Sequence, residues 1–416
     1  MDYKTTEATN NRYLAIFCLF LLVILAKYNI YMGFALKPFM IFTILYLVIN
    51  LNAFYFHRLQ LFEIIMLLFY LVYCFTGAFA LYPVSSIRIM LGIFLYLGCY
   101  FIMKAIIGET KESLIEKALS SVGILFNSAS LLLYFLGLHR VHFIFEGDRI
   151  SKFGMMLDRN YPRLIGLMQD PNFYVFYNTV FFAYFLCNSK SIKNKVGLIL
   201  CILTNLLTFS RGGMLVMLLL LFLYILLNNP LKKIRLISGL FLSVFLVAYI
   251  AIVKFNFNFI GIMMERIADT TDDGGSGRLA LWGRAWHYFE NHMYVGVGAF
   301  NFSDYNLHDY GDTLTVHNTF LDILSDSGLV GIFFFLLFIG CVLYQLLQNR
   351  MHKHHPYLFL TFIGLILQMG FLSVVINDMF FLYIAILSAY INKQAPLSLK
   401  DNRSARMPLS LSSSLK

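Results

Sequence analysis

The chain has 416 residues, of which 59% are hydrophobic and 13% are charged. Soluble globular proteins carry about 25% charged residues, so this chain lacks the charge needed to cover the several soluble domains that its length would otherwise suggest. Its apolar residues form long runs, and a bilayer-spanning helix needs about 20 such residues. The sequence therefore predicts an all-α polytopic membrane protein.

The apolar runs predict about twelve transmembrane helices. They begin near Tyr13, Phe39, Leu61, Ser86, Leu114, Asn172, Val196, Gly213, Ile234, Gly328, Tyr357 and Met379. The first run lacks a small-residue cleavage site, so we do not expect a cleaved signal peptide. The six cysteines lie in or at the ends of these runs, so no disulfide framework is expected.

The distribution of basic residues predicts the orientation. Nineteen of the 32 Lys and Arg residues lie in short segments on the side that carries both termini. Because short cytoplasmic loops are rich in Lys and Arg, both termini are expected in the cytoplasm, and two long loops, 139–171 and 255–325, are expected outside with short helices in them. Residues 1–393 would form one transmembrane domain and residues 394–416 a disordered tail. The net charge of +10 then reflects topology and anionic lipids, not nucleic-acid binding.

Charged residues within the predicted spans are few. Glu63, Arg88 and Asp378 fall near span ends, where side chains reach the interface by snorkelling. A transporter usually carries ionisable groups near the middle of the bilayer, so a flippase is disfavoured. The polar residues gather in the outer loops, which predicts chemistry at the outer membrane surface.

Two segments place an arginine at the outer end of a predicted span. Arg163 shortly precedes Asp-Pro at residues 170–171, a pair typical of a helix start, and it is positioned to reach an anionic ligand. Arg211 belongs to the Ser-Arg-Gly-Gly segment 210–213 between two apolar runs. This segment is consistent with a tight turn whose arginine snorkels, or with a fixed cation for phosphate, since guanidinium binds phosphate oxygens in bidentate geometry.

The second long loop predicts an amphipathic helix that begins near Ser276. Leu279, Trp282, Ala285, Trp286 and Phe289 fall on one face at spacings of three or four. This face is typical of a helix that lies on the lipid surface. The same helix carries Arg278 in its first turn, against the helix dipole, and Arg284 further along, and both arginines are candidate anion ligands.

A histidine follows in the same loop. Asn318 or Thr319 is expected to cap a short helix that ends near Ser327-Gly328, which places His317 just outside the helix N-terminus. The positive end of the helix favours a neutral ring, as a general base needs. The alternative is an ordinary surface histidine. For the acidic residues at 269–273, a solvated linker is a better interpretation than a metal site, and no metal site is expected.

These motifs together resemble the O-antigen ligase and polysaccharide polymerase superfamily of bacterial inner membranes. The matching pieces are Ser210-Arg211-Gly212-Gly213, Gly277-Arg278-Leu279 with Trp282, Gly296-Val297-Gly298, His317-Asn318-Thr319-Phe320-Leu321 and Asp326-Ser327-Gly328-Leu329. Asp326 stands where a glutamate is expected. The order and spacing of the motifs agree over residues 160–350.

The resemblance implies glycosyl transfer from an undecaprenyl-pyrophosphate-linked glycan to an acceptor hydroxyl at the periplasmic face, without a cofactor. It implies that His317 accepts the proton of that hydroxyl. Arg211 and Arg278 would bind the pyrophosphate leaving group in place of a metal ion, with Arg163 and Arg284 as weaker candidates.

Two activities within the superfamily remain open. A polymerase adds lipid-linked repeats of an O-antigen, capsule or exopolysaccharide, and a chain-length regulator is then a possible partner. A ligase transfers the finished glycan to lipid A–core. The Ser-Arg-Gly-Gly and His-Asn-Thr-Phe forms look more like polymerases. A polysaccharide flippase is the distant alternative.

Overall fold

The computed structural model describes residues 2–32, 34–51, 54, 58–145, 149–158, 161–227, 238–239, 261 and 277–404, with side chains between residues 11 and 394 of these ranges. Four helices in these ranges are long and apolar enough to cross a membrane: Leu61–Phe79, Pro83–Gly108, Glu112–Arg140 and Thr319–Gln348. The chain is therefore a mostly helical membrane protein, as predicted.

The helices follow the predicted apolar runs. They are α1 (Asp2–Ile24), α2 (Pro38–Ile49), α3 (Leu61–Thr76), η2 (Gly77–Phe79), α4 (Pro83–Gly108), α5 (Glu112–Arg140), α6 (Pro171–Cys187), α7 (Ile192–Leu207), α8 (Arg211–Leu227), α11 (Arg278–Asn291), α12 (Phe302–Tyr310), α13 (Thr319–Gln348), α14 (Met351–His354), α15 (Pro356–Met369) and α16 (Asp378–Ser404). Each predicted run coincides with a helix except the run near Ile234, which lies outside the described residues. The total of twelve spans stays a prediction.

The first long loop corrects one expectation. We expected short helices in residues 139–171, but the loop forms an antiparallel sheet of β3 (Ile150–Lys152), β4 (Met155–Asp158) and β5 (Tyr161–Leu164). The sheet is fixed to the end of α5, because the Tyr134 hydroxyl donates to the Pro162 carbonyl oxygen at 2.8 Å. A second small sheet pairs β1 (Ile30–Tyr31) with β2 (Ala35–Leu36). In the second long loop, α11 and α12 are short helices, as expected.

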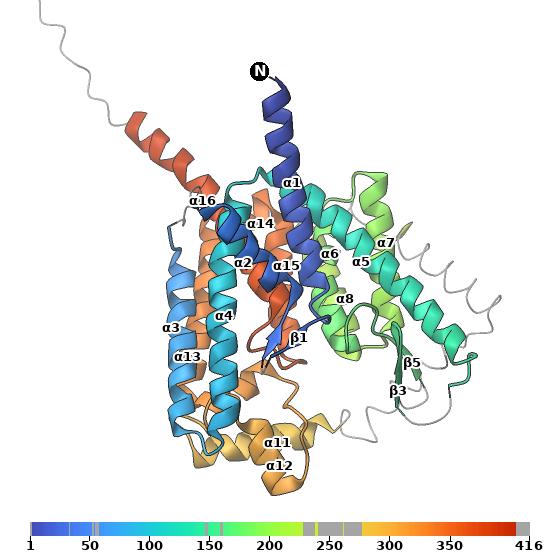
Figure 1. Cartoon of the computed structure of the whole chain (residues 1–416), viewed down its shortest axis with the longest axis vertical. Helices are drawn as coiled ribbons and strands as arrows, with labels where there is room; N and C mark the ends of the chain where they lie inside the picture. The colour runs from blue at the N-terminus through green and yellow to red at the C-terminus, as the bar shows by residue number, and fades with distance from the viewer. Residues whose placement is uncertain are drawn as a thin grey trace, which may run out of the picture.

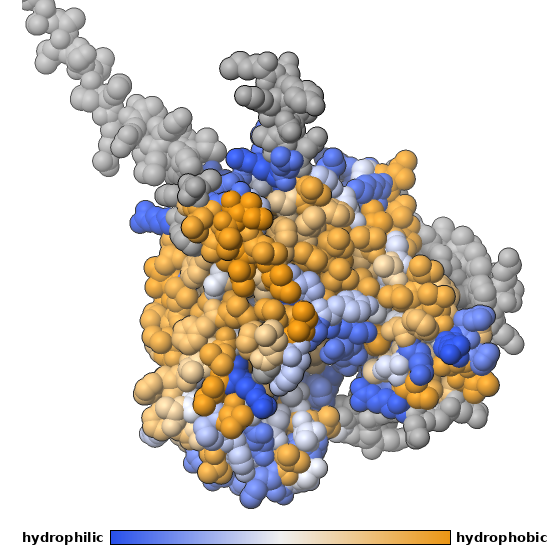
Figure 2. All heavy atoms as spheres, viewed as in Figure 1, coloured by the Kyte–Doolittle hydropathy of each residue, from blue (hydrophilic) through white to orange (hydrophobic). Residues whose placement is uncertain are grey.

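The long helices pack side by side in pairs, with α3 against α13, α4 against α16, and α6 against α15. Figure 1 shows α11 and α12 lying across one end of this bundle, while the start of α1 and the end of α16 lie at the opposite end. On the face drawn in Figure 2, apolar residues cover much of the body, with hydrophilic residues towards both ends and in a central hollow. An apolar belt between two polar ends is the surface that a bilayer requires.

The α16 helix runs from Asp378 to Ser404 and so extends past residue 394. The division into a transmembrane domain at 1–393 and a disordered tail at 394–416 stays a prediction.

Two carboxylates at span ends are buried, although snorkelling was expected. Glu63, in the first turn of α3, is 0% exposed and pairs with Lys104 at 2.7 Å. Asp378, the first residue of α16, is 1% exposed and pairs with Lys37 at 2.8 Å. Tyr177 also donates to Asp378, at 2.7 Å. Both carboxylates are thus neutralised inside the protein, so their burial needs no transport role.

Candidate functional site

His317 is held in place by its backbone. It directly precedes α13, whose N-cap Asn318 accepts from the amides of Phe320 (3.0 Å) and Leu321 (3.3 Å) through Oδ1. The expected capping residue is thus confirmed. The amide of His317 donates to Ser373 Oγ at 2.9 Å. A helix start and the link between α15 and α16 therefore fix the position of this half-buried ring.

The α13 helix is interrupted at Gly328, where φ is 62° and ψ is −160°. The helical turns after His317 thus end at the expected Ser327-Gly328 position, and a second helical part continues as the apolar span. A Cβ at Gly328 would lie 2.4 Å from the carbonyl carbon of Tyr294. The same close approach occurs at Gly296, whose Cβ would lie 2.3 Å from the carbonyl carbon of Asp326. The glycines of the predicted turn therefore let the loop after α11 pack directly on α13.

The predicted apolar face of α11 is divided in the structure. The helix begins at Arg278, two residues after the expected start, and buries Leu281, Ala285 and Tyr288 against α13 and its neighbours. Leu279 and Trp286 are exposed. Trp282 also contacts the protein interior, because its Nε1 donates to the Val316 carbonyl oxygen at 3.1 Å. This bond fixes the backbone of Val316, the residue that precedes His317.

The environment of His317 favours a neutral ring. Its pKa is lowered from the usual value of 6.5, first by burial and then by the positive charges of Arg278 and Arg149, while Asp170 opposes the shift. A neutral ring was expected because of the helix N-terminus. The pKa of His317 is lowered as expected, but the main cause is burial, which disfavours the charged form.

Arg163 and Arg278 approach the same region from different elements. Arg163, in β5, is 7% exposed; its Nε donates to the Thr208 carbonyl oxygen at 3.1 Å, and its guanidinium pairs with Asp158 at 3.2 Å. Burial is the main cause that lowers the pKa of Arg163, and the positive charge of Arg278 acts in the same direction. Arg278 thus interacts electrostatically with both Arg163 and His317. Similar positive charges held near each other form a site that favours an anion.

Arg211 begins α8, next to the same link that holds His317. Ser210 Oγ donates to Asn172 Oδ1 at 2.8 Å and accepts from the amide of Gly213 at 3.3 Å. Gly212 follows Arg211, and its backbone packs closely on Phe371. A Cβ at Gly212 would lie 2.8 Å from the ring of Phe371. Phe371 is two residues from Ser373, so α8 and His317 are anchored to one short segment.

Arg284 has a different position from the other three arginines. Its guanidinium donates to Asn306 Oδ1 at 2.8 Å and to Asp312 Oδ2 at 3.1 Å, and it lies 4.2 Å from the ring centre of Tyr310. These contacts fasten α11 to α12 and to the loop that follows it. Arg284 therefore has a structural role, which the sequence did not predict.

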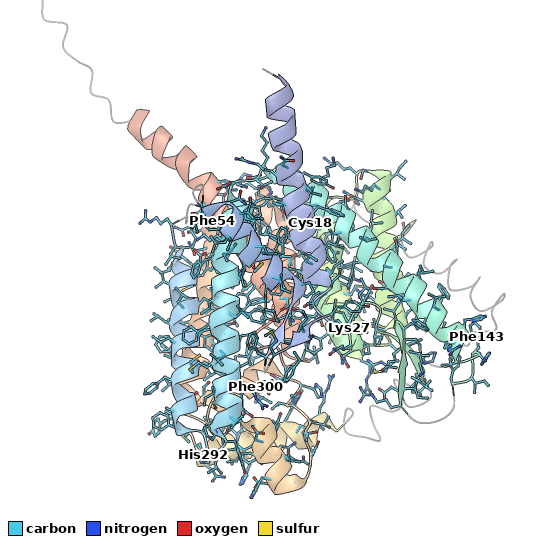
Figure 3. All side chains as sticks on the ribbon, viewed as in Figure 1. Cys18, Lys27, Phe54, Phe143, His292 and Phe300 are labelled. Atoms are coloured by element: carbon cyan, nitrogen blue, oxygen red, sulfur yellow. The ribbon has the colours of Figure 1, made fainter. Side chains whose placement is uncertain are left out.

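His317 lines a pocket of about 190 Å³. The lining residues are Phe173, Phe300, Phe302, Ser303, Thr315, His317, Asp322, Asp326, Leu372, Ser373 and Val375. A second pocket, of about 330 Å³, shares Phe173 and includes Lys27, Lys37 and Asp378 in its wall. Figure 3 labels Phe300, above α11 and α12, and Lys27, nearer the centre of the molecule. Phe173 thus lines both pockets.

Residues 196–336 match the family model described as O-antigen ligase. This part of the chain is similar to the O-antigen ligase family. The match lies within the range 160–350 for which the resemblance was expected, and it contains Arg211, Arg278, Arg284 and His317. A search of curated proteins found no match to the chain.

Some residues near His317 were not predicted as site residues. Asp322 and Asp326 are four residues apart in α13, a spacing that places both on one helix face and that could have been read from the sequence. Arg149 and Asp170, which act electrostatically on His317, come from outside the matched segment and carry no such signal. In the described part of the chain, no group of three His, Cys, Asp or Glu side chains is arranged to hold a metal ion. The acidic residues at 269–273 lie outside it.

Proposed function

We propose that the protein polymerises undecaprenyl-pyrophosphate-linked oligosaccharide repeats, by glycosyl transfer at the periplasmic face of the bacterial inner membrane. The observation that carries this proposal is a half-buried histidine with a lowered pKa beside Arg278, within the segment similar to the O-antigen ligase family. A neutral imidazole and a cationic region are the two elements needed to deprotonate a hydroxyl and to stabilise a pyrophosphate leaving group.

In the proposed reaction, His317 accepts the proton of the acceptor hydroxyl as its oxygen forms a bond to the anomeric carbon of the donor. The bond between that carbon and the pyrophosphate oxygen breaks, and its electron pair leaves with the lipid pyrophosphate. Arg278 and Arg211 stabilise the developing negative charge, and Arg163 supports the anion from β5. Positioned proton transfer of this kind contributes about 10²–10⁴-fold to the rate.

The arrangement in Figure 1 supports the proposed topology, because the start of α1 and the end of α16 lie at one end of the molecule and α11 and α12 at the other. With both termini in the cytoplasm, His317 faces the periplasm. Membrane lipids and a chain-length regulator are the proposed partners of a polymerase.

A ligase that transfers the glycan to lipid A–core is the second candidate. The Ser-Arg-Gly-Gly segment at 210–213 and the His-Asn-Thr-Phe segment at 317–320 favour the polymerase. In a deletion strain examined by lipopolysaccharide gel, core carrying a single repeat indicates a polymerase. Bare core with accumulated lipid-linked polymer indicates a ligase, and an unchanged glycan profile contradicts both.

Replacement of His317 tests the general-base role. We expect His317→Ala in the complemented deletion strain to abolish polymer, because the loss of about 10²–10⁴-fold in rate removes visible product. His308→Ala is the matched control, since His308 lies on α12 with an exposed side chain. Polymer at the wild-type level in His317→Ala, with both variants present in the membrane, would contradict the proposal.

A further inference from the structure

A buried carboxylate oxygen in the His317 pocket has no partner. Asp322 lies in the first turn of α13, is 6% exposed and lines this pocket. Ser373 and the Val316 backbone lie close to its carboxylate. Its Oδ2 has no hydrogen-bond partner in the described part of the chain. Buried polar atoms are nearly always paired, so such an atom calls for a functional explanation.

The neighbouring carboxylate shows the contrast. Asp326, one turn further along α13, is 2% exposed and accepts from the Tyr73 hydroxyl at 2.8 Å and from the amides of Phe300 (3.0 Å), Asn301 (3.2 Å) and Phe302 (3.0 Å). The hydrogen bonds that Asp326 accepts therefore hold the loop after α11 in place. Asp322 is also buried but does not hold this loop, so the fold alone does not account for its burial.

The walls of the pocket indicate what binds there. Three phenylalanines form its apolar part, and hydroxyl groups of Ser303, Thr315 and Ser373 lie among the polar lining residues. None of the described lining residues is a lysine or arginine, and two are aspartates, so the pocket does not suit a pyrophosphate. An aromatic surface with a few polar groups suits a sugar ring, which has apolar C–H faces and a hydroxyl edge.

We propose that this pocket binds the acceptor sugar, and that Asp322 Oδ2 accepts a hydrogen bond from one of its hydroxyls while His317 receives the proton of the attacking hydroxyl. The inference rests on the proposed glycosyl transfer. It assigns His317 a position between two substrates: the anionic donor is held on the side of Arg278, and the neutral acceptor is held in the pocket with Asp322.

The unpartnered oxygen gives the proposal a distinctive test. Asp322→Asn keeps the shape of the side chain and replaces a carboxyl oxygen that the fold leaves without a partner, so the purified protein should unfold at the same temperature or higher. Transfer should fall about 10- to 100-fold, as expected when a buried hydrogen-bond partner of the substrate is lost. The substrate for this assay is the lipid-linked oligosaccharide extracted from the deletion strain.

Asp326→Asn is the matched control, because Asp326 is a second buried aspartate on the same helix. Because Asp326 accepts four hydrogen bonds, its replacement should lower the unfolding temperature. Binding of undecaprenyl pyrophosphate separates the two substrate sides: Asp322→Asn should bind this lipid within about twofold of the wild type, whereas Arg278→Ala should bind it less tightly.

Three results would overturn the assignment of Asp322. They are wild-type transfer by Asp322→Asn, a fall in unfolding temperature equal to that of Asp326→Asn, and weakened binding of undecaprenyl pyrophosphate by Asp322→Asn. The proposed function fails separately, if His317→Ala transfers at the wild-type rate. An inactive His317→Ala with a fully active Asp322→Asn would remove only the acceptor pocket.

Discussion

Three residues that border the site, Phe209, Phe300 and His317, have positive φ angles of 49°, 58° and 56°. The left-handed conformation costs a residue with a Cβ about 1–2 kcal/mol. Hydrogen bonds hold two of these backbones, because the amide of Phe300 donates to Asp326 and that of His317 donates to Ser373. Strain of this kind concentrates at functional sites, and here it occurs just before Arg211, at the pocket wall and at the proposed base.

The pH dependence of transfer should report the charge on Arg278. His317 acts as a base in its neutral form, so the rate falls as the pH drops through the pKa of His317. Burial and the Arg278 charge lower this pKa. Arg278→Gln removes a positive charge, so the pKa rises and the acidic limb of the rate profile moves to higher pH, by up to about one unit for an interaction of about 1.4 kcal/mol.

The measurement is the initial rate of transfer by purified protein from acidic to neutral pH. Arg284→Gln is the control, because Arg284 pairs with Asp312 and is not among the charges that shift His317. Its acidic limb should stay at the wild-type position. An unmoved acidic limb in Arg278→Gln would contradict the proposed coupling.

At the scale of residues, the sequence predicted which residues belong to the candidate site, but not which groups their side chains contact. The motif around His317 and the capping role of Asn318 depend on neighbours in the chain, and the structure confirms the cap. The contacts of Arg163 were not predictable, because Thr208 is 45 positions away in the sequence. The unpartnered oxygen of Asp322 follows from three-dimensional packing, which no local pattern encodes.

At the scale of elements, α13 depends on its interruption. Gly328→Ala should destabilise the protein for two reasons. The alanine would have to adopt a φ of 62°, and its Cβ would lie 2.4 Å from the carbonyl carbon of Tyr294. This combination of φ and ψ is essentially restricted to glycine and costs other residues about 1–3 kcal/mol, and the contact adds to it. Thermal unfolding of the purified protein measures this loss.

Gly340→Ala provides the control within the same helix. A Cβ at Gly340 meets no atom within 4 Å, and alanine favours a helix by about 1 kcal/mol over glycine. This variant should unfold at the wild-type temperature or above. Equal unfolding temperatures for the two variants would show that the interruption at Gly328 is not required.

Helices were more predictable than strands because of their length. The apolar runs extend over many residues, and each described helix of the bundle coincides with one of them. The strands β3, β4 and β5 have only three or four residues each, and β4 and β5 are buried on both faces. The alternation of polar and apolar residues that reveals a half-buried strand is therefore missing from the first long loop.

At the scale of the whole molecule, buried ion pairs connect helices that are distant in the sequence. Glu63→Gln and Lys104→Met should each destabilise the protein by about 3–5 kcal/mol, because each leaves an unpaired buried charge. The double variant should lose less than the sum of the two, since no charge remains. Unfolding temperatures of the three variants measure this difference.

A lysine outside the core serves as the control for this series. Lys353 is exposed, so Lys353→Met should change the stability by about 0.5 kcal/mol or less. Additive losses in the double variant would argue that Glu63 and Lys104 act independently. The sequence showed these charges near span ends, but it contained nothing that paired them across α3 and α4.

The hydrogen bond from Tyr73 to Asp326 has a consequence for how this protein can be divided. Asp326 lies within the matched segment 196–336, whereas Tyr73 belongs to α3 and Ser373 follows α15. The matched segment thus relies on contacts with residues outside it. Chimaeras that exchange this segment between relatives would move His317 without the side chains that orient it. A functional exchange has to include α3 and the link at residues 370–377 as well.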